Sequence, residues 1–538
     1  MVRKTFILND PVLHLPVEDT DRMWYVKIMD GEQQFAEFYI ALSEKPDFYC
    51  PLYLHALEGK AVTLCCDDEN VPDDLFEGIR EGGTIEGRPE LYPDMYGEPE
   101  RQQVHFSSRR GWLNDPNGLV YADGKFRMCY QHNPYGPNHG GVNVSWGLAV
   151  SEDGVHFTEY PDAVRPWDSL THIASGSAVV DEQNLAGKGT GTILASYTAL
   201  ESEMKKGRTS VGTRGQILDY STDGGYTFRH LTEDPIIPVP AGEWWRDPKI
   251  LQVEDGKLCI AVYETYEGKN CVSFYSSSDC IHWEFRSRTM DLYECPDLFP
   301  LTVSETGEEL WVLYGGAGYY SVGKFENFTF TPIGERHHLD YGTATYAGQT
   351  WNSHPSKTER YHIAWFRDPT VRWRYDPEVN RGVPFAQSMT LLCVFTLHKT
   401  EDGYRLFRNP IPAFDTLRDG EPAVYGLSEA VTVNTPAELE VTLDAETPVT
   451  VTVSGKGLTW NPETGIVDFT GEKQYRLTMA AKEPFKVRIV LDTHSAEFFV
   501  CGEVSATYAV TEPEKILTVD GKASGQVKMW KLSSIWKK

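Results

Sequence analysis

The sequence is poor in positive charge. It has 50 lysine and arginine residues against 78 aspartate and glutamate residues, which leaves a formal net charge of -28 at pH 7. A chain this acidic repels phosphate backbones and anionic lipid headgroups. The composition therefore argues against nucleic acid and membrane surfaces as partners, and a neutral substrate fits it best.

Long apolar runs are also missing. Asn9, Asp10 and Pro11 interrupt the N-terminal stretch before it reaches the apolar length of a signal peptide, and no later segment approaches the length of a membrane span. We therefore expect no membrane partner and a cytoplasmic location, or a secreted one if a signal was removed from the chain as given.

The cysteine spacing gives no sign of a metal centre. Ten cysteines are scattered along the chain, and the adjacent Cys65 and Cys66 have no matching CxxC pair elsewhere, so zinc-ligand spacing is absent. We expect neither a metal nor a cofactor. Buried unpaired thiols are expected in preference to a disulfide framework.

Amphipathic helical patterns are scarce, whereas short β-branched and aromatic runs recur between turn signals. This pattern predicts a nearly all-β protein. Three segments resemble one another, each with Ser and Asp on a tight turn and an aromatic residue shortly after: 149–157, 220–228 and 275–283. The recurrence predicts blades of a β-propeller, although three unrelated β-turns would produce the same pattern.

At 538 residues the chain exceeds what one hydrophobic core usually organises. A Gly-, Pro- and acid-rich segment at 81–100 separates the first strand-like runs from the rest. A second break near 405–422 precedes alternating runs that are typical of a sandwich. The predicted domains are a small N-terminal β domain with its linker (1–98), a β-propeller (99–408) and a C-terminal β-sandwich (409–538).

Three short segments hold acidic residues in settings that turn formation alone does not require. They are GWLNDPNGLVY with Asp115, EWWRDPKI with Asp247 and DLYECPDLFPL with Glu294. Taken singly, each has a plain alternative: a turn, a structural Arg-Asp pair and a glutamate that faces solvent.

Physical chemistry suggests roles for two of these acids. Asp247 follows Arg246, and a neighbouring guanidinium should keep it ionised, which suits stabilisation of positive charge. Glu294 lies among mostly apolar residues of an expected strand. Because burial disfavours the charged form of a carboxyl group, such a glutamate should hold a proton near neutrality and donate it.

Together and in this order, the three segments resemble the marks of the fructan-processing glycoside hydrolases of family 32, which include invertases, levanases and inulinases. Those marks are a W-[LM]-N-D-P-N-G segment, an R-D-P segment and an E-C-P segment. The resemblance spans about residues 104–408. It implies a five-bladed β-propeller that carries the active site, followed by a β-sandwich. The N-terminal region resembles a small β domain that precedes the catalytic domain in some bacterial levanase-like members.

Carried over to this sequence, the resemblance implies a retaining mechanism with three carboxylates. Asp115 would be the nucleophile, Glu294 the acid/base and Asp247 the stabiliser of the transition state. The residues that would hold the fructosyl unit are Trp112, Asn114, Gln131, Ser175 and Arg246. A second Arg-Asp-Pro segment follows the E-C-P segment, where the family has no catalytic acid, so its Asp368 is expected to be structural.

The chain departs from the family pattern at four places. Where the family usually has a tryptophan after the Gln-x-Asn-Pro run, this chain has NHGGVNVSW, so one pocket wall is expected to be rebuilt around His139, Asn143 or Trp146. The other departures are Leu148 for a histidine, Ala344 for an acidic residue and Leu392 for a proline. None of them touches the three carboxylates.

The leading hypothesis is an exo-acting enzyme that releases terminal β-D-fructosyl units from fructans, fructo-oligosaccharides or sucrose. The altered wall also fits a hydrolase of an unusual fructose disaccharide or difructose dianhydride. A fructosyltransferase would share the same covalent intermediate. A carbohydrate-binding protein without catalysis fits the scaffold alone, but the complete set of carboxylates favours an enzyme.

Overall fold

The computed structural model describes most of the chain, and the predicted linker at 81–100 lies largely outside the described residues. These are residues 1–18, 22–46, 48–54, 57–82, 96–137, 139, 144–165, 171–201, 215–238, 245–253, 256–290, 292–369, 383, 385–471, 473–478 and 484–536. The described chain is nearly all β, as predicted, with a short 3₁₀ helix, η5 (Pro412–Leu417). None of its helices is long and apolar enough to cross a membrane. All ten cysteines are free thiols, and nine are buried.

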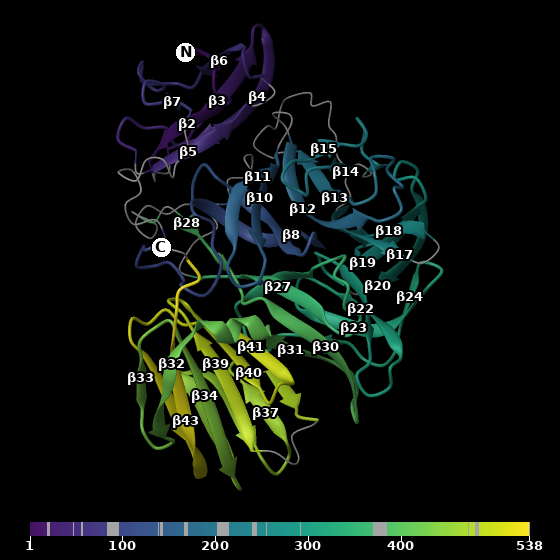
Figure 1. Cartoon of the computed structure of the whole chain (residues 1–538), viewed down its shortest axis with the longest axis vertical. Coiled ribbons are helices and arrows are strands. Elements are labelled where there is room, and N and C mark those ends of the chain that lie inside the picture. The colour runs from purple at the N-terminus through teal and green to yellow at the C-terminus, as the bar shows by residue number, and fades with distance from the viewer. Residues whose placement is uncertain are drawn as a thin grey trace.

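Two small sheets form what we call the N-terminal unit, residues 2–81, at the purple end of Figure 1. Buried leucine, valine, isoleucine and aromatic side chains from both sheets share one core. The first sheet has the order β1-β6-β3-β4, with β1 (Val2–Ile7), β6 (Ala61–Cys66), β3 (Trp24–Asp30) and β4 (Gln33–Ile40). The second has the order β5-β2-β7, with β5 (Phe48–Tyr53), β2 (Val12–Val17) and β7 (Arg80–Glu81).

Five antiparallel sheets follow one another along what we call the central unit, residues 111–410 of the described chain. The first contains β8 (Gly111–Ala122), β9 (Lys125–Asn133), β10 (Ser145–Ser151) and β11 (Thr158–Val164). The second contains β12 (Thr171–Asp181), β13 (Thr192–Glu201), β14 (Gly215–Ser221), β15 (Arg229–His230) and β16 (Ile237–Pro238). The third contains β17 (Trp245–Val253), β18 (Lys257–Tyr266), β19 (Lys269–Ser277) and β20 (Glu284–Met290).

The last two sheets of the central unit have the same plan. The fourth contains β21 (Asp297–Thr302), β22 (Glu309–Tyr314), β23 (Tyr319–Glu326), β24 (Thr329–Pro332) and β25 (His337–His338). The fifth contains β26 (Thr345–Thr350), β27 (Arg360–Phe366), β29 (Ser388–Met389), β30 (Cys393–Thr400) and β31 (Gly403–Pro410). Between β27 and β30, the short strand β28 (Phe385–Ala386) joins the first sheet, where it pairs in parallel with β8. The end of the unit is therefore hydrogen bonded to its beginning.

The three Ser-Asp segments form the same turn in the first three sheets. Each lies between the third and fourth strand of its sheet. In each, the serine hydroxyl donates to the aspartate carboxylate, over 3.0 Å at Ser151, 2.7 Å at Ser221 and 3.1 Å at Ser277. The same carboxylate accepts backbone N–H groups further along the turn. The predicted repeat is confirmed as a recurring hairpin whose geometry is set by local hydrogen bonds.

Polar side chains connect the first strands of the five sheets to one another. β8 contacts both β12 and β26, β12 contacts β17, and β17 contacts β21. Asn352 donates to the carbonyls of Ala178 and Ile250, each over 2.8 Å. The buried pair of Lys249 and Asp297, 2.8 Å apart, joins β17 to β21. These contacts hold the first strands of the sheets together.

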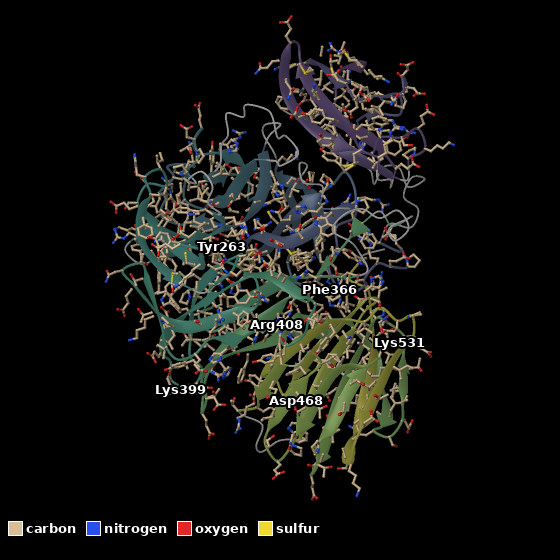
Figure 2. The ribbon with its side chains drawn as sticks, turned by 180° about the vertical axis from the view of Figure 1, so that it is seen from behind. Tyr263, Phe366, Lys399, Arg408, Asp468 and Lys531 are labelled. Atoms are coloured by element: carbon tan, nitrogen blue, oxygen red, sulfur yellow. The ribbon has the colours of Figure 1, made fainter. Side chains whose placement is uncertain are left out.

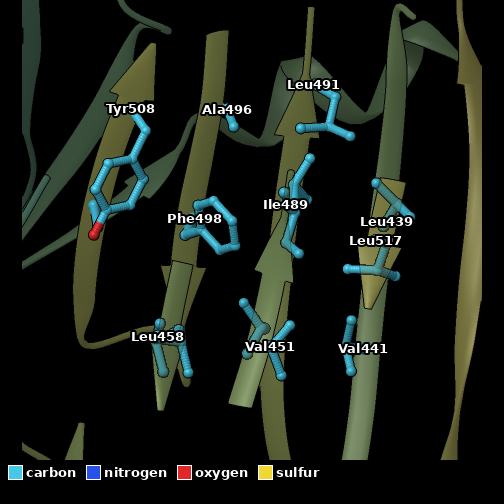
Figure 3. Close-up of a cluster of buried hydrophobic side chains, with 14 of the residues drawn as sticks. Leu439, Val441, Val451, Leu458, Ile489, Leu491, Ala496, Phe498, Tyr508 and Leu517 are labelled. Atoms are coloured by element: carbon cyan, nitrogen blue, oxygen red, sulfur yellow. The ribbon is translucent and has the colours of Figure 1, made fainter. Parts of the chain in front are cut away.

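Two six-stranded sheets pack face to face in what we call the C-terminal unit, residues 418–532. One contains β32 (Arg418–Gly426), β43 (Ala523–Leu532), β34 (Ala437–Ala445), β39 (Phe485–Leu491), β40 (Ser495–Val500) and β41 (Val504–Ala509). The other contains β33 (Val431–Val433), β42 (Lys515–Asp520), β35 (Val449–Val453), β36 (Lys456–Asn461), β37 (Ile466–Phe469) and β38 (Lys473–Arg476). Alternate apolar side chains of both sheets, such as Ile489 and Val451, meet between them (Figure 3).

A buried set of charged side chains joins the central and C-terminal units. His105 is hydrogen bonded to Asp492 over 2.8 Å and to Glu497 over 3.1 Å. Arg408, which Figure 2 shows between the two units, donates to the other Glu497 oxygen over 3.1 Å. We call these four residues the interface cluster. Each acid in it has a basic partner, so negative and positive charges are paired within the cluster.

Candidate active site

Four of the five sheets of the central unit carry the same irregularity near the start of their first strand. In β8, β12, β17 and β26, two residues of the first strand lie opposite one residue of the neighbouring strand. Such a bulge bends the strand and redirects its side chains. The residues in the four bulges are Asn114 and Asp115, Ala174 and Ser175, Asp247 and Pro248, and Ala347 and Gly348.

The bulges bring predicted site residues from separate sheets to one place. Ser175 donates a hydrogen bond to Oδ2 of Asp115 over 2.7 Å. Gly176 follows directly, and a Cβ there would lie 2.0 Å from the Ser196 carbonyl oxygen, so the close approach of the strands requires glycine. The bulge and the glycine after it thus fix Ser175 beside Asp115.

Asp115 also receives support from its own strand. The Asn114 amide donates to Oδ1 over 3.0 Å, and Trp112 donates its indole N–H to the Asn114 oxygen over 2.8 Å. Burial raises the pKa of Asp115, and the negative charge of Glu294 adds to this, against the hydrogen bonds from Ser175 and Asn114. Asp115 is therefore oriented by Ser175 and Asn114 in a site that disfavours excess negative charge.

Asp247 is buried, with 5% of its surface exposed, and its backbone has φ of 63°. A non-glycine residue rarely adopts this left-handed conformation, and such strain is concentrated at functional sites. Burial raises the pKa of Asp247 to about 7; Arg246 opposes this shift, while Asp115 and Glu294 add to it. The expectation that Arg246 keeps Asp247 ionised at low pH is therefore wrong, because burial and two acidic neighbours outweigh one guanidinium.

Glu294 lies in a bend directly before β21, with φ of 49°, and not within a strand as predicted. Its surroundings are also more polar than the sequence indicated. Arg246 donates to one carboxylate oxygen and the Tyr346 hydroxyl donates to the other. The bend turns the Glu294 side chain toward Arg246 of the third sheet and Tyr346 of the fifth sheet.

Cys295 joins the two aspartates. Its backbone N–H donates to Oδ2 of Asp247 over 3.1 Å, and its sulfur lies 3.6 Å from Oδ2 of both Asp115 and Asp247. Arg246 in turn joins Asp247, 3.7 Å away, to Glu294. The structure therefore brings together Asp115, Asp247 and Glu294, although 179 positions separate the first from the last (294 minus 115).

The remaining predicted residues lie around this cluster. Trp112, Asn114, Ser175 and Arg246 make the contacts described above. Gln131 is buried beside them, and its amide donates to the Ile173 carbonyl over 3.0 Å, which holds β9 against the bulged part of β12. Among the described contacts, Gln131 therefore supports the position of Ser175.

Sequence reasoning missed two residues of the site. Tyr346 touches Glu294, and Cys295 touches both aspartates, yet neither was assigned a role. A signal for each was present, because Cys295 lies inside the E-C-P segment and Tyr346 lies two residues after Ala344, one of the departures from the family pattern. Their contacts depend on the bends before β21 and within β26, which the sequence did not indicate.

The altered pocket wall is described in part. The His139 ring packs edge-on against Trp112, with centroids 6.2 Å apart, and lies 5.7 Å from the His172 ring. Trp146 is fully buried and donates its indole N–H to the Ala174 carbonyl over 3.0 Å, so it holds the bulge of β12 in place. Asn143 lies outside the described residues.

The other departures lie away from the carboxylates. Leu148, Ala344 and Leu392 are buried core residues. Asp368, in the second Arg-Asp-Pro segment, is hydrogen bonded to His494 of the C-terminal unit over 2.6 Å. This contact agrees with the structural role expected for Asp368.

The chemistry of the site does not call for a metal ion. Within the described residues, no group of three or more His, Cys, Asp or Glu side chains is arranged to hold one. The negative charge of the cluster is instead opposed by the Arg246 guanidinium, which also lies 4.9 Å from the Tyr263 ring.

Comparison with known proteins places this site in a family. Residues 105–410 match the family model described as the glycosyl hydrolases family 32 N-terminal domain. A levanase of Bacillus subtilis (strain 168) is 31% identical over 348 residues, which cover 60% of this chain and 48% of the levanase. An invertase of Schizosaccharomyces pombe is 31% identical over 380 residues, which cover 65% of this chain and 62% of the invertase. The chain thus matches about half to just under two thirds of the length of these relatives.

Solved structures show the same fold. The exo-inulinase of Aspergillus awamori superposes with a TM-score of 0.67 at 22% identity and covers 82% of this chain and 100% of its own. A fructofuranosidase of Schwanniomyces occidentalis, complexed with fructose, superposes with a TM-score of 0.66 at 21% identity over 82% of this chain and 99% of its own. Because the matching family model spans more than half of the chain, the protein belongs to family 32 of the glycosyl hydrolases.

Proposed function

We propose that this protein is a retaining glycoside hydrolase that releases terminal β-D-fructosyl units from fructans, fructo-oligosaccharides or sucrose. The observation that carries the proposal is the meeting of Asp115, Asp247 and Glu294 around Arg246 and Cys295. Family membership supports it, and so does the similarity to a levanase and an invertase.

In the first half of the reaction, Asp115 attacks the anomeric carbon of the fructosyl unit and Glu294 protonates the leaving oxygen. Ser175 and Asn114 hold the Asp115 carboxylate in one orientation, so the attacking oxygen is positioned before the substrate arrives. As positive charge develops on the sugar ring, ionised Asp247 stabilises it. The positive charge of the transition state favours the ionised form of Asp247, because it offsets the negative charges of the neighbouring carboxylates.

In the second half, Glu294 takes a proton from water, and the water then hydrolyses the fructosyl ester of Asp115. This step requires Glu294 to be ionised. Both of its oxygens accept hydrogen bonds in the structure, one from Arg246 and one from Tyr346. We propose that Arg246 and Tyr346 hold the Glu294 side chain in place, both when it acts as an acid and when it acts as a base.

We further propose that the five sheets of the central unit are the five blades of a β-propeller and that their first strands surround its axis. The contacts between successive first strands and the pairing of β28 with β8 support this arrangement. The three units then correspond to domains at 1–98, 99–408 and 409–538. On this plan each blade presents its bulge, or the bend before β21, at one end of the axis.

The proposal is tested by incubating the protein with sucrose, inulin and levan, and by following the first-formed product with NMR. We expect free fructose from the first minutes, in the β configuration before mutarotation. Early release of long oligosaccharides would show endo-acting cleavage, and α-fructose as the first product would contradict the retaining mechanism.

The histidines near Trp112 also support a second candidate substrate class. The segment that contains His139 replaces a stretch in which the family usually has a tryptophan, and the His139 ring packs against Trp112. Difructose dianhydrides, levanbiose and fructosyl transfer to added sucrose belong in the same panel. Hydrolysis of a dianhydride at a higher kcat/KM than sucrose, or longer products with sucrose alone, would assign the protein to that alternative.

A further inference from the structure

The N-terminal unit lies outside the matching family model, yet it packs next to the candidate active site. Figure 1 shows it beside the first sheet of the central unit, near β10, β11 and β28. The contact is made directly after β9, the strand that carries Gln131. The Tyr135 ring stacks on Phe38 of β4, with centroids 5.0 Å apart and planes 20° apart, and it packs against the core of the N-terminal unit.

A second contact fixes the residue before Tyr135. The thiol of Cys50, in β5 of the N-terminal unit, donates to the Pro134 carbonyl over 2.7 Å. The Tyr135 backbone N–H donates to the side chain of Asn133 over 3.1 Å, and Asn133 is paired with Trp112 across β8 and β9. Pro134 and Tyr135, the first two residues after β9, are therefore held between the N-terminal unit and the strand that bears Asp115.

Four residues after Tyr135, His139 reaches the active site. Its ring packs edge-on against Trp112 and lies near the His172 ring, and we call His139 and His172 the histidine wall. Burial and the neighbouring His172 lower the pKa of His139 to about 3, so its ring is uncharged at neutral pH. An uncharged ring packs on a neutral sugar or an indole without a desolvation penalty for charge.

From Trp112 the contacts continue to the nucleophile. The indole N–H holds Asn114, and Asn114 holds Asp115. Trp112 also packs edge-on against Trp365, with centroids 6.2 Å apart. A displacement of His139 would therefore free one edge of Trp112, while Trp365 and Ser175 keep Trp112 and Asp115 in place. Ring packing and hydrogen bonds connect Phe38 to Tyr135 and His139 to Asp115. The covalent chain connects Tyr135 to His139.

We propose that the N-terminal unit positions the active site for substrate: by holding Pro134 and Tyr135 it fixes His139 against Trp112, and so determines how tightly the fructosyl substrate binds. The inference rests on the proposed function of Asp115. Phe38, Cys50 and Tyr135 are positioning residues that act through His139. The unit is thus a specificity determinant that lies outside the part of the chain matched by the family model.

The test compares Phe38→Ala, His139→Ala and the double variant, with kcat and KM measured on sucrose and on a short fructan. We expect each single variant to raise KM about fivefold, the equivalent of ~1 kcal/mol for a lost ring contact, with a much smaller change in kcat. The double variant should match His139→Ala alone, because Phe38 acts through His139. Multiplied effects in the double variant, or a wild-type KM in folded Phe38→Ala, would overturn the proposal.

Two further variants separate positioning from loss of structure. Tyr39→Ala removes the ring next to Phe38 in β4, whose side chain points to the opposite face of the strand, and it should leave KM unchanged. Tyr135→Phe should keep the wild-type KM, whereas Tyr135→Ala should raise it like Phe38→Ala.

Hydrogen exchange provides a readout that does not depend on turnover. Backbone amides of 111–117 should exchange faster in Phe38→Ala than in Tyr39→Ala, and equal exchange would contradict the inference even if the wild-type protein hydrolysed none of the substrates. If the wild-type enzyme is active and the effects of Phe38→Ala and His139→Ala multiply in the double variant, only this inference is refuted. Full activity of Asp115→Asn would refute the proposed function instead.

Discussion

The candidate active site and the interface cluster are both buried sets of acidic side chains, but they treat charge in opposite ways. At the interface, Asp492 and Glu497 have His105 and Arg408 as partners. Burial acts to raise the pKa of each acid, yet hydrogen bonds and the charges of these partners lower it overall. At the active site Asp247 and Glu294 share Arg246, a third carboxylate, Asp115, lies beside them, and the pKa of Asp247 rises to about 7.

The comparison shows which cluster serves stability and which serves chemistry. A compensated cluster gains its full interaction energy in the resting protein, and breaking it leaves a charge buried alone. An undercompensated cluster is costly at rest and becomes favourable when positive charge develops on a substrate. Removing a carboxylate should therefore have opposite effects on stability in the two places.

The largest expected effect is on turnover in Asp115→Asn. The variant should lose at least about 10⁴-fold in kcat, because the nucleophile is removed while Ser175 and Asn114 keep their places. Its thermal unfolding temperature should equal or exceed that of the wild type. Asp368→Asn, which changes the acid of the second Arg-Asp-Pro segment, is the matched control and should remain active; comparable losses in both variants would refute the assignment.

Glu294→Gln should have a smaller effect that depends on the leaving group. General acid catalysis contributes about 10²–10⁴-fold, and only sugars with poor leaving groups need the proton. We expect sucrose hydrolysis to fall by that factor, whereas release of an activated aryl leaving group should change far less in the first half of the reaction. Equal losses for both substrates in burst kinetics would show that Glu294 is not the acid.

At the interface, Asp492→Asn should destabilise the protein by about 3–5 kcal/mol while kcat of the folded fraction stays unchanged, because it removes one of the two acids that compensate the buried charge of His105. Glu463→Gln, at an exposed turn of the C-terminal unit, is the control and should have little effect. Denaturant unfolding with an activity assay measures both. A stability equal to that of the control would mean that the cluster does not join the units.

The same cluster has a predicted pH dependence. Burial acts to lower the pKa of His105, but hydrogen bonds to Asp492 and Glu497 raise it to about 9, above the ordinary value of 6.5. Its contribution to stability is therefore complete below about pH 6.5 and is lost as the pH rises through 9. Wild-type unfolding should shift over this window, and the shift should be reduced in His105→Gln.

The smallest expected effect is a gain in stability from Asp247→Asn. The pKa of Asp247 is raised from 3.8 to about 7, so the stability that its protonated form provides is complete below about pH 3.8 and lost as the pH rises through 7. The asparagine variant cannot ionise and should unfold ~2–4 °C higher than the wild type at pH 8. At pH 5 the difference should be smaller, and a variant that is less stable at pH 8 would contradict the comparison.

Much of the fold followed from local patterns. The alternating runs predicted strands, and the Ser-Asp turns predicted a repeated hairpin, because a turn's hydrogen bonds close within a few residues, as between Ser151 and Asp153. The bulges in β8, β12, β17 and β26 were not predicted. A bulge is defined by the register of two paired strands, and single-strand patterns do not contain that register.

The sequence by itself determined the identity of the three carboxylates and the family, because the motifs around Asp115, Asp247 and Glu294 are contiguous in the chain. Only the tertiary structure decided their electrostatics. Arg246 is adjacent to Asp247 in sequence but is shared with Glu294 in space, and burial of Asp247 then outweighs it. The link from Phe38 to His139 was equally invisible, since ring packing between distant segments leaves no spacing rule in the sequence. Charge and contact in a folded chain depend on distance and solvent exposure, which adjacency in sequence does not specify.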